Sequence, residues 1–412
     1  MKRIISLLMA LAMATSLAAC GPSNNAATGE TGVSAANSEN GNSGTGSYSY
    51  VIGHYGGVTG SVATAGTAGL NAIKLCIKQW NENGGVLGGQ IGFEFYDDGA
   101  TTEGAVKGVS YLIDNKKVNG IIASQLSGNI QATGNLVESA KIPEVGTGTN
   151  PAWLQKGWKY LFRSIANSNG GAAPLVDAMD KLGVTKLATL IYQDDGNTAS
   201  NKQVLEEVNK RGKIQVVSEQ KAMVGETDWT GAMSAIINSN PNGVIIFAQG
   251  EQGSLMVKQI RNLGYTGYIF GCETMSMPDI RKVAGDSANG IVFFTPHCIP
   301  DSADEGATDK EKEFLKAYEK EYGSLPAHDV AYRAYDATTV LLTAVKEAGT
   351  ADGTKVRDTI AKMKIDLLAG AADYSAFDNG ECLSGQKVYI IHQGKNIPFD
   401  NFIKENPADT YQ

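Results

Sequence analysis

From residue 49 onward, short apolar runs alternate with longer segments whose apolar residues recur at helical spacing. The apolar runs that predict strands in this first half are 49–55, 91–98, 119–124 and 142–146. Leu70, Ile73, Ile77 and Trp80 predict a helix that ends before Gly84, and further helices are expected through Val106, Val109 and Leu112 and from 128 to 140. Strands that alternate with helices predict a parallel sheet covered on both faces.

The same alternation restarts after residue 166. The strands predicted there are 186–192, 214–219, 242–248, 267–271 and 290–296, and the helices are 170–182, 198–211, 228–239 and 251–263. Two long helical segments follow, at 308–322 and 328–348, and the first has Thr308 as its expected N-cap and Gly323 as its expected stop. The tail returns to short strands, including 387–392. The fold class predicted is therefore α/β, with two doubly wound parallel-sheet lobes.

The N-terminal segment has a different character. Residues 1–19 combine Lys2 and Arg3 with an apolar stretch and a small-residue end, which predicts an export signal. The ending Leu-Ala-Ala-Cys resembles a bacterial lipobox, so we expect lipidation at Cys20; in the alternative, the signal is an ordinary cleaved one and Cys20 is incidental. Residues 20–48 are rich in Gly, Ser, Asn and Thr and predict a flexible lipidated linker.

Composition narrows the classes of partner. The chain has 412 residues and a formal net charge of −8, without the clustered Lys and Arg that phosphate binding needs, so no nucleic-acid partner is expected. No second hydrophobic run approaches membrane-spanning length, which leaves the N-terminal lipid as the expected membrane attachment. The other cysteines, at 76, 272, 298 and 382, show no C-x-x-C spacing and no evident disulfide framework.

Motifs that carry catalytic chemistry are missing from the sequence. The four histidines are scattered, and neither a G-x-S-x-G elbow, a complete G-x-G-x-x-G nor a P-loop occurs. The pairs Asp97-Asp98 and Asp194-Asp195 follow strands, where such residues more often form turns or helix caps than acid/base pairs. We therefore expect no enzyme activity, no metal and no cofactor; an enzyme on the same fold is the alternative, which a bound cofactor would support.

Four loops lie where the strands of a parallel sheet end, and ligands usually bind there. These loops are 124–129, 146–150, 248–250 and 271–274. The first two offer hydroxyls, glycine amides and a helix start, which suit a small anion. The last two offer the amide of Gln249 and the carboxylate of Glu273.

Glu273 follows the apolar run 268–270, and the nearest cationic residue along the chain is Arg281. Its carboxylate is therefore solvated, paired with a group from elsewhere in the fold, or paired with a ligand. An anion site that faces a carboxylate suits a zwitterion, so we expect a ligand ammonium to pair with Glu273.

Three segments carry a family resemblance: "WNENGGVLGGQIGFEFYDDGAT", "LSGNIQATG" and "GTGTNP". They resemble the type I periplasmic binding proteins of the branched-chain amino acid (leucine-binding) family, which are solute receptors of ABC importers. The resemblance covers residues 49–412 and implies two lobes that close on a ligand and are joined by three crossings. These crossings are expected near 163–167, 291–296 and 368–374. Lobe one would then be 49–165 plus 295–369, and lobe two 166–293 plus 370–412.

The resemblance also implies roles for single residues. Ser127 and Thr149 fall on positions that contact the ligand carboxylate, Thr147 on a position used through its backbone, and Glu273 on the acid that pairs with the ammonium. The alternative for the two hydroxyls is a helix cap or a loop contact. The positions where leucine/isoleucine/valine binders carry tyrosines hold Ala65, Gly196 (or a neighbour) and Gln249, so the pocket is expected to differ in shape and to be more polar. Further candidates for contact with the ligand side chain are Tyr55, Gln125, Tyr332 and Asp195.

The function expected from these features is a monomeric, exported and lipid-anchored receptor that captures an amino acid or close analogue and delivers it to an ABC permease. Two alternatives stay open. One is a receptor of the same fold for a non-zwitterionic solute such as an amide, urea or an aromatic acid. The other is a surface sensor or adhesin built on this fold.

Overall fold

The computed structural model describes residues 47–223, 225–248 and 250–406, with every side chain in those ranges except that of Asp195. The chain from Ser47 onward forms one unit. The predicted signal peptide, almost all of the linker and Cys20 lie outside the described residues, as does Gln249. Within the described ranges, no helix combines the length and the apolarity needed to cross a membrane.

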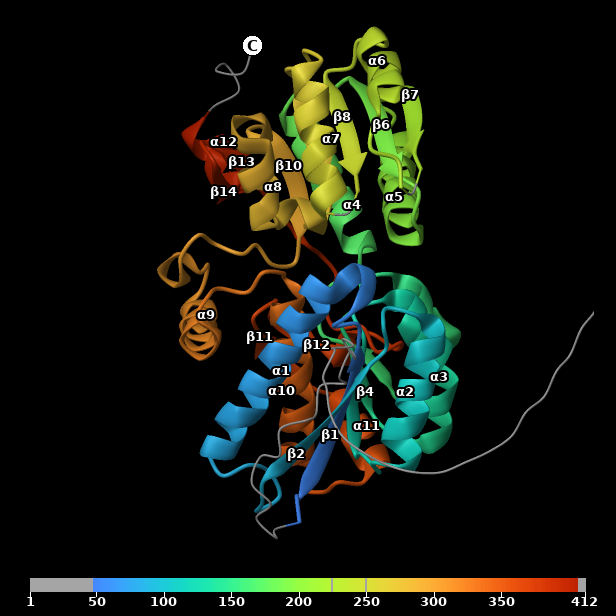
Figure 1. Cartoon of the computed structure of the whole chain (residues 1–412), viewed down its shortest axis with the longest axis vertical. Coiled ribbons are helices and arrows are strands. Elements are labelled where there is room, and N and C mark those ends of the chain that lie inside the picture. The colour runs from blue at the N-terminus through green and yellow to red at the C-terminus, as the bar shows by residue number, and fades with distance from the viewer. Residues whose placement is uncertain (1–46, 224, 249, 407–412) are drawn as a thin grey trace, which may run out of the picture. The chain divides into compact units, whose positions relative to one another are not determined.

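The first lobe is built on a parallel sheet with the strand order β2-β1-β3-β4-β5 (Figure 1). Its strands are β1 (Tyr50–Gly56), β2 (Ile91–Asp97), β3 (Gly120–Ile122), β4 (Glu144–Gly146) and β5 (Leu161–Arg163). Its helices are α1 (Ala63–Glu82), α2 (Thr102–Asp114), α3 (Ser127–Ala140), α9 (Asp309–Tyr322), α10 (Val330–Ala348) and α11 (Gly353–Ile360). Alternate residues of a strand point to opposite faces, so Tyr50 and Ile52 pack with α1 and α10 while Tyr55 packs with α2 and α3.

The second lobe is built on a mixed sheet with the order β14-β13-β10-β9-β8-β6-β7. Five parallel strands, β6 (Lys186–Tyr192), β7 (Gln215–Ala222), β8 (Gly243–Phe247), β9 (Tyr268–Gly271) and β10 (Ile291–Thr295), are extended by the antiparallel β13 (Lys387–His392) and β14 (Lys395–Pro398). The helices are α4 (Asn169–Lys181), α5 (Asp195–Arg211), α6 (Thr230–Asn238), α7 (Gly250–Asn262), α8 (Pro278–Ala284) and α12 (Phe399–Glu405).

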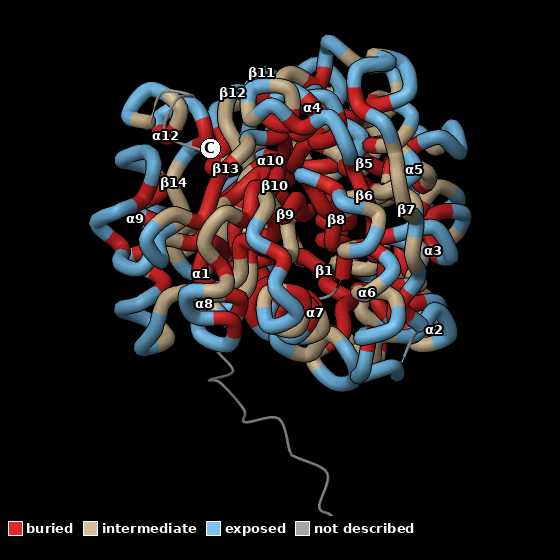
Figure 2. The backbone as a smooth tube through the Cα atoms, turned by 90° about the horizontal axis from the view of Figure 1, so that it is seen from above, coloured by how far each residue is buried: buried red, intermediate tan, exposed pale blue. Residues whose placement is uncertain are grey.

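Helices cover both faces of this second sheet, which explains its continuous apolar strands. In β8, Val244 and Ile246 pack toward α6, α7 and α8, while Ile245 and Phe247 pack toward α4 and α5. All four side chains are fully buried, and the central strands lie among buried segments in the view from above (Figure 2). A strand that is buried on both faces needs apolar residues at every position, not only at alternate ones.

The chain passes between the lobes three times. The first passage lies between Arg163 and Asn169. The second lies between Thr295 and Asp309, after the expected 291–296, because residues 291–295 form β10 of the second-lobe sheet. The third lies later than the sequence-based position of 368–374, because β11 (Lys364–Leu367) pairs with β12 (Gly370–Asp373) and the chain stays in the first-lobe core as far as Cys382. Residues 370–382 therefore belong to lobe one rather than lobe two, and the chain returns to lobe two just before β13.

Local signals at the helix ends were read correctly from the sequence. The Thr308 hydroxyl accepts a hydrogen bond from the Glu311 amide at 3.1 Å and caps α9, and Gly323 ends that helix with a φ of +78°. Asp194 caps α5 by accepting from the Asn197 amide at 2.8 Å. This contact confirms that Asp194 is a helix cap.

Candidate functional site

A cleft of about 510 Å³ lies where the strand ends of the two lobes face each other. The first lobe contributes the starts of α1, α3 and α10 and the loop after β4, and the second lobe contributes the start of α5 and the segment after β9. Of the residues predicted to contact a ligand, those that line the cleft are Ala65, Gln125, Ser127, Thr149, Gly196 and Glu273. The structure thus brings both predicted loops of the first lobe opposite Glu273.

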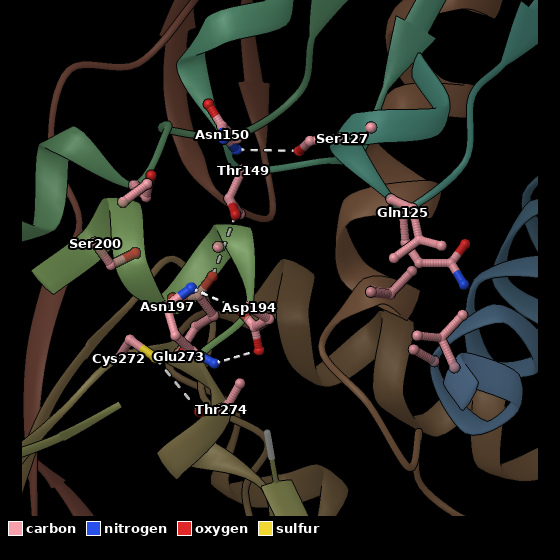
Figure 3. A pocket seen from close by; sticks show the side chains of 18 of the residues that line it. Gln125, Ser127, Thr149, Asn150, Asp194, Asn197, Ser200, Cys272, Glu273 and Thr274 are labelled. Carbon is pink, nitrogen blue, oxygen red and sulfur yellow. Dashed lines mark hydrogen bonds between the residues drawn. The ribbon is translucent and has the colours of Figure 1, made fainter. Parts of the chain in front are cut away.

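Glu273 and Thr149 meet across the cleft. The Thr149 hydroxyl donates to Glu273 Oε1 at 3.3 Å, joining residues 124 positions apart in the chain (Figure 3). The other carboxylate oxygen, Oε2, is buried and has no hydrogen-bond partner among the described residues. A buried carboxylate oxygen without a partner costs free energy, and a donor from a ligand would remove that cost.

The backbone after β9 holds Glu273 at the mouth of the second-lobe sheet. The Ser276 hydroxyl donates to the Glu273 carbonyl at 2.7 Å, and the Thr274 hydroxyl donates to the carbonyl of Ala248 at the end of β8 at 2.7 Å. Next to Glu273, burial raises the pKa of the Cys272 thiol far above its ordinary value, so this cysteine stays neutral. The carboxylate is therefore positioned by short side chains that hydrogen-bond to backbone.

Ser127 ties the two loops of the first lobe together. It is the first residue of α3, and its hydroxyl oxygen accepts a hydrogen bond from the Asn150 amide at 3.1 Å (Figure 3). A hydroxyl has one donor hydrogen as well as its acceptor lone pairs, so the Ser127 O–H can still donate to a ligand carboxylate. The positive end of α3 favours an anion at the same place.

The start of α5 gives the cleft a polar second-lobe wall. Asn197 donates from Nδ2 to Asp194 Oδ2 at 2.7 Å and accepts at Oδ1 from the Cys272 thiol at 3.8 Å. Gly196 adds space, because a Cβ placed there would meet only Asp194 Oδ1, at 3.6 Å. The Asp195 side chain lies outside the described part of the structure.

The side chains of Tyr55, Tyr332 and Thr147 turn into the first-lobe interior, although Thr147 was expected to act through its backbone alone. The Tyr55 hydroxyl lies 2.8 Å from Thr133 Oγ1, and the Tyr332 ring stacks on His297 with centroids 4.7 Å apart; both tyrosines are fully buried and neither lines the cleft. The Thr147 hydroxyl donates to a backbone carbonyl at 3.2 Å inside the lobe. The two tyrosines are therefore core residues, because the faces of β1 and α10 that carry them pack against other helices.

Among the cleft residues missed from the sequence are Asn197, Ser200, His328 and Arg333. Asn197 and Ser200 lie on α5 just after β6, so the strand-end rule would have found them if it had been applied to that strand. His328 and Arg333 come from the start of α10, which follows no strand, and nothing in their local sequence marked them.

Asp329 holds the two basic residues of α10 in place. Its carboxylate accepts from Arg333 Nε at 2.8 Å and lies 2.9 Å from His328 Nδ1. Burial alone would raise the pKa of Asp329, but the neighbouring Arg333 guanidinium holds it well below its ordinary value. This end of the cleft is therefore polar while its charges are largely matched.

The described ranges contain no group of three or more His, Cys, Asp and Glu residues placed to hold a metal ion. The four described cysteines are free thiols.

Comparison with known proteins agrees with this geometry. A family model described as periplasmic binding protein matches residues 49–386. The leucine-, isoleucine-, valine-, threonine-, and alanine-binding protein of Pseudomonas aeruginosa is 24% identical over 308 residues, covering 74% of this chain and 80% of its own. The leucine-specific-binding protein of Salmonella typhimurium is 24% identical over 293 residues, covering 70% of this chain and 77% of its own.

Solved structures show the same fold. The branched-chain amino acid transporter substrate binding protein from Streptococcus pneumoniae, in complex with isoleucine, has a TM-score of 0.73 at 20% identity and covers 84% of this chain and 97% of its own. A solute binding protein of an ABC transporter from Rhodopseudomonas palustris, in complex with 3,4-dihydroxy benzoic acid, has a TM-score of 0.73 at 25% identity and covers 85% and 96%. The sequence match and the two α/β lobes together show that this chain belongs to the periplasmic binding protein family and has its type I fold.

Proposed function

We propose that this protein is the solute-binding receptor of an ABC importer and captures an amino acid or close analogue between its two lobes. The observation that carries the proposal is Glu273: one of its oxygens is buried without a hydrogen-bond partner among the described residues, in a cleft whose opposite wall holds Ser127 and Thr149. A zwitterion complements both walls at once. Relatives named for binding leucine, isoleucine, valine, threonine and alanine support the choice of ligand class.

Binding proceeds in two steps. The ligand carboxylate first meets the Ser127 hydroxyl, the Thr149 hydroxyl and the amides at the start of α3 in lobe one. The lobes then rotate about the three crossings, which brings Glu273 onto the ammonium and excludes water. Charge-assisted hydrogen bonds strengthen as water leaves, so the closed form is the one that the ligand stabilises.

The remaining parts of the proposal concern location and partners. The monomeric protein is exported, held at the outer side of a membrane by a lipid on Cys20, and presents its ligand to the transmembrane subunits of a permease. It performs no covalent chemistry. Globomycin, which blocks lipoprotein signal cleavage, tests the anchor: the unprocessed precursor should accumulate, and normal processing would contradict lipidation.

A panel of the twenty L-amino acids, titrated calorimetrically, tests the ligand class. We expect at least one to bind, and we expect Glu273→Gln to weaken that binding at least about tenfold, because a hydrogen bond to a charged group contributes about 1.5–3 kcal/mol. Glu251→Gln is the matched control, since Glu251 is an exposed acid of the same lobe outside the cleft. Equal affinities in wild type and Glu273→Gln would remove the ammonium role.

An aromatic acid is the second candidate ligand. It is supported by the Rhodopseudomonas palustris neighbour in complex with 3,4-dihydroxy benzoic acid and by a second one in complex with benzoate. Including benzoate and 3,4-dihydroxybenzoate in the panel separates the two candidates. Because a carboxylate lacking an amine would meet Glu273 as a like charge, its binding should improve in Glu273→Gln.

A further inference from the structure

The short segment 147–150, which carries Thr149, is held in place by donors outside it that hydrogen-bond to its backbone carbonyls. The carbonyls of Gly148 and Asn150 both accept from the guanidinium of Arg163, the latter at 2.8 Å from Nη2. Arg163 is the last residue of β5 and is fully buried. One side chain thus fixes two carbonyls that lie two residues apart.

The other two carbonyls of the segment also have donors outside it. The Thr147 carbonyl accepts from Arg333 Nη1 at 3.4 Å, and the Thr149 carbonyl accepts from the Ser168 amide at 2.9 Å. All four carbonyls are therefore engaged by donors from β5, the first crossing and α10. With its carbonyls fixed, the segment presents the Thr149 hydroxyl to Glu273.

A fully buried guanidinium needs a counter-charge, and this one has it in Glu381, just before the third crossing. Arg163 Nε lies 3.1 Å from Glu381 Oε2, and Glu381 Oε1 accepts from Asn167 Nδ2 at 2.8 Å. The guanidinium also lies 4.4 Å from the centre of the Trp153 ring. Burial lowers the pKa of Arg163 to about 10, which leaves it protonated at neutral pH.

We infer that Arg163 is a positioning residue of the binding site: its guanidinium, anchored by Glu381, holds segment 147–150 in the conformation that presents Thr149 to the cleft. Arg163 directly precedes the first crossing, and Glu381 directly precedes the third. Because Arg163 also hydrogen-bonds to segment 147–150, this ion pair connects the segment to the starts of two of the three crossings. A planar fork of donors suits this task, because a lysine ammonium cannot span both carbonyls with the same geometry. The inference depends on the proposed function only in assigning Thr149 to ligand binding.

Hydrogen–deuterium exchange of the ligand-free protein tests directly whether Arg163 holds segment 147–150. In Arg163→Gln we expect peptides covering 147–150 to exchange at least about tenfold faster, because without the two Arg163 hydrogen bonds to its carbonyls the segment opens more often and the Asn150 amide leaves its acceptor, the Ser127 hydroxyl. Arg261→Gln is the matched control: Arg261 also donates to backbone carbonyls, among them those of Tyr265 at 2.9 Å and Gly267 at 2.6 Å, but it lies in lobe two and outside the cleft. That control should leave exchange at 147–150 unchanged.

Removing Arg163 leaves Glu381 as a buried charge without its partner, so Arg163→Gln could fail to fold. Arg163→Lys keeps the charge and serves in that case, with a smaller acceleration expected at 147–150. Wild-type exchange at 147–150 in a folded Arg163→Gln or Arg163→Lys would overturn the inference. Equal acceleration in Arg261→Gln would overturn it too, because the effect would then be general loss of stability.

Ligand affinity gives the second readout, with the tightest-binding amino acid of the panel as the probe. We expect Arg163→Gln to lose at least about tenfold in affinity while Arg261→Gln keeps wild-type affinity. Faster exchange with unchanged affinity would refute the positioning role. Exchange is measured without ligand. A panel in which no amino acid binds would therefore refute the proposed function but would not affect the conclusion that Arg163 holds segment 147–150.

Discussion

Glu144→Gln should change how the stability of this protein depends on pH. Glu144 lies in β4, between β3 and β5 of the first-lobe sheet, and is fully buried. Its Oε1 accepts from the Tyr55 hydroxyl at 3.4 Å, while Oε2 has no hydrogen-bond partner among the described residues. Burial raises the pKa of this carboxyl from 4.5 to about 8, so the folded protein holds it protonated at neutral pH.

The direction in which the free energy of unfolding changes with pH follows from proton linkage. Between pH 4.5 and about 8 the unfolded chain has released the Glu144 proton and the folded chain still holds it, so the free energy of unfolding falls as pH rises. At about 1.4 kcal/mol per pH unit, this window gives an upper limit of about 5 kcal/mol. We expect about 2–5 kcal/mol of this pH dependence to disappear in Glu144→Gln, which cannot titrate.

Urea unfolding at a series of pH values across that window is the assay. The free energy of unfolding of Glu144→Gln should decline less steeply than that of wild type, and the variant should be the more stable protein at pH 8. Glu82→Gln, at an exposed acid of α1 in the same lobe, is the control and should keep the wild-type slope. A Glu144→Gln slope equal to that of wild type would refute a protonated Glu144.

Two further substitutions test other buried contacts. Asp336 accepts from both backbone amides of 368–369, at 2.8 and 2.9 Å. Asp336→Asn should therefore lower the free energy of unfolding by about 1–3 kcal/mol, because one amide loses its acceptor; an unchanged urea midpoint would contradict this. Gly134→Ala should destabilise by about 1–3 kcal/mol because its Cβ would meet the Trp158 ring at 2.2–2.5 Å. Gly128→Ala in the same helix has no neighbour within 4 Å and should cost nothing, and equal melting temperatures in these two variants would argue against the clash.

The alternation of strands and helices could be predicted because buried parallel strands have a distinctive pattern. A run such as 243–247 is apolar at every position, which few other elements of this length show. The third crossing was misplaced because β11 and β12 form a short hairpin whose residues are only partly apolar. Its membership of lobe one depends on packing against distant residues of the first-lobe core, which no local pattern reports.

The candidate site also contains residues that the local sequence predicts and residues that it does not. Glu273 and the two hydroxyl loops could be found because the ends of parallel strands meet at one edge of a sheet. Tyr55 and Tyr332 were assigned to the cleft, but the face on which a tyrosine packs is decided by helices elsewhere in the chain. Arg163 carried no local signal at all, since its ion-pair partner Glu381 lies more than two hundred residues away.

The return of the chain to the first lobe has a consequence for the order of assembly. The hydroxyl of Tyr335 on α10 donates to Gln79 on α1 across a separation of 256 residues, so α1 has its partner helix only after most of the chain has been made. Strands β6 to β10, in contrast, come from one continuous stretch and can pair with each other early. Contacts between residues far apart in the chain form slowly. The apolar face of the first sheet and α1 therefore stay uncovered for longest during folding. During folding, the exposed first-lobe sheet and α1 are therefore the part of this protein most prone to aggregate. A chaperone that covers them would give the greatest benefit.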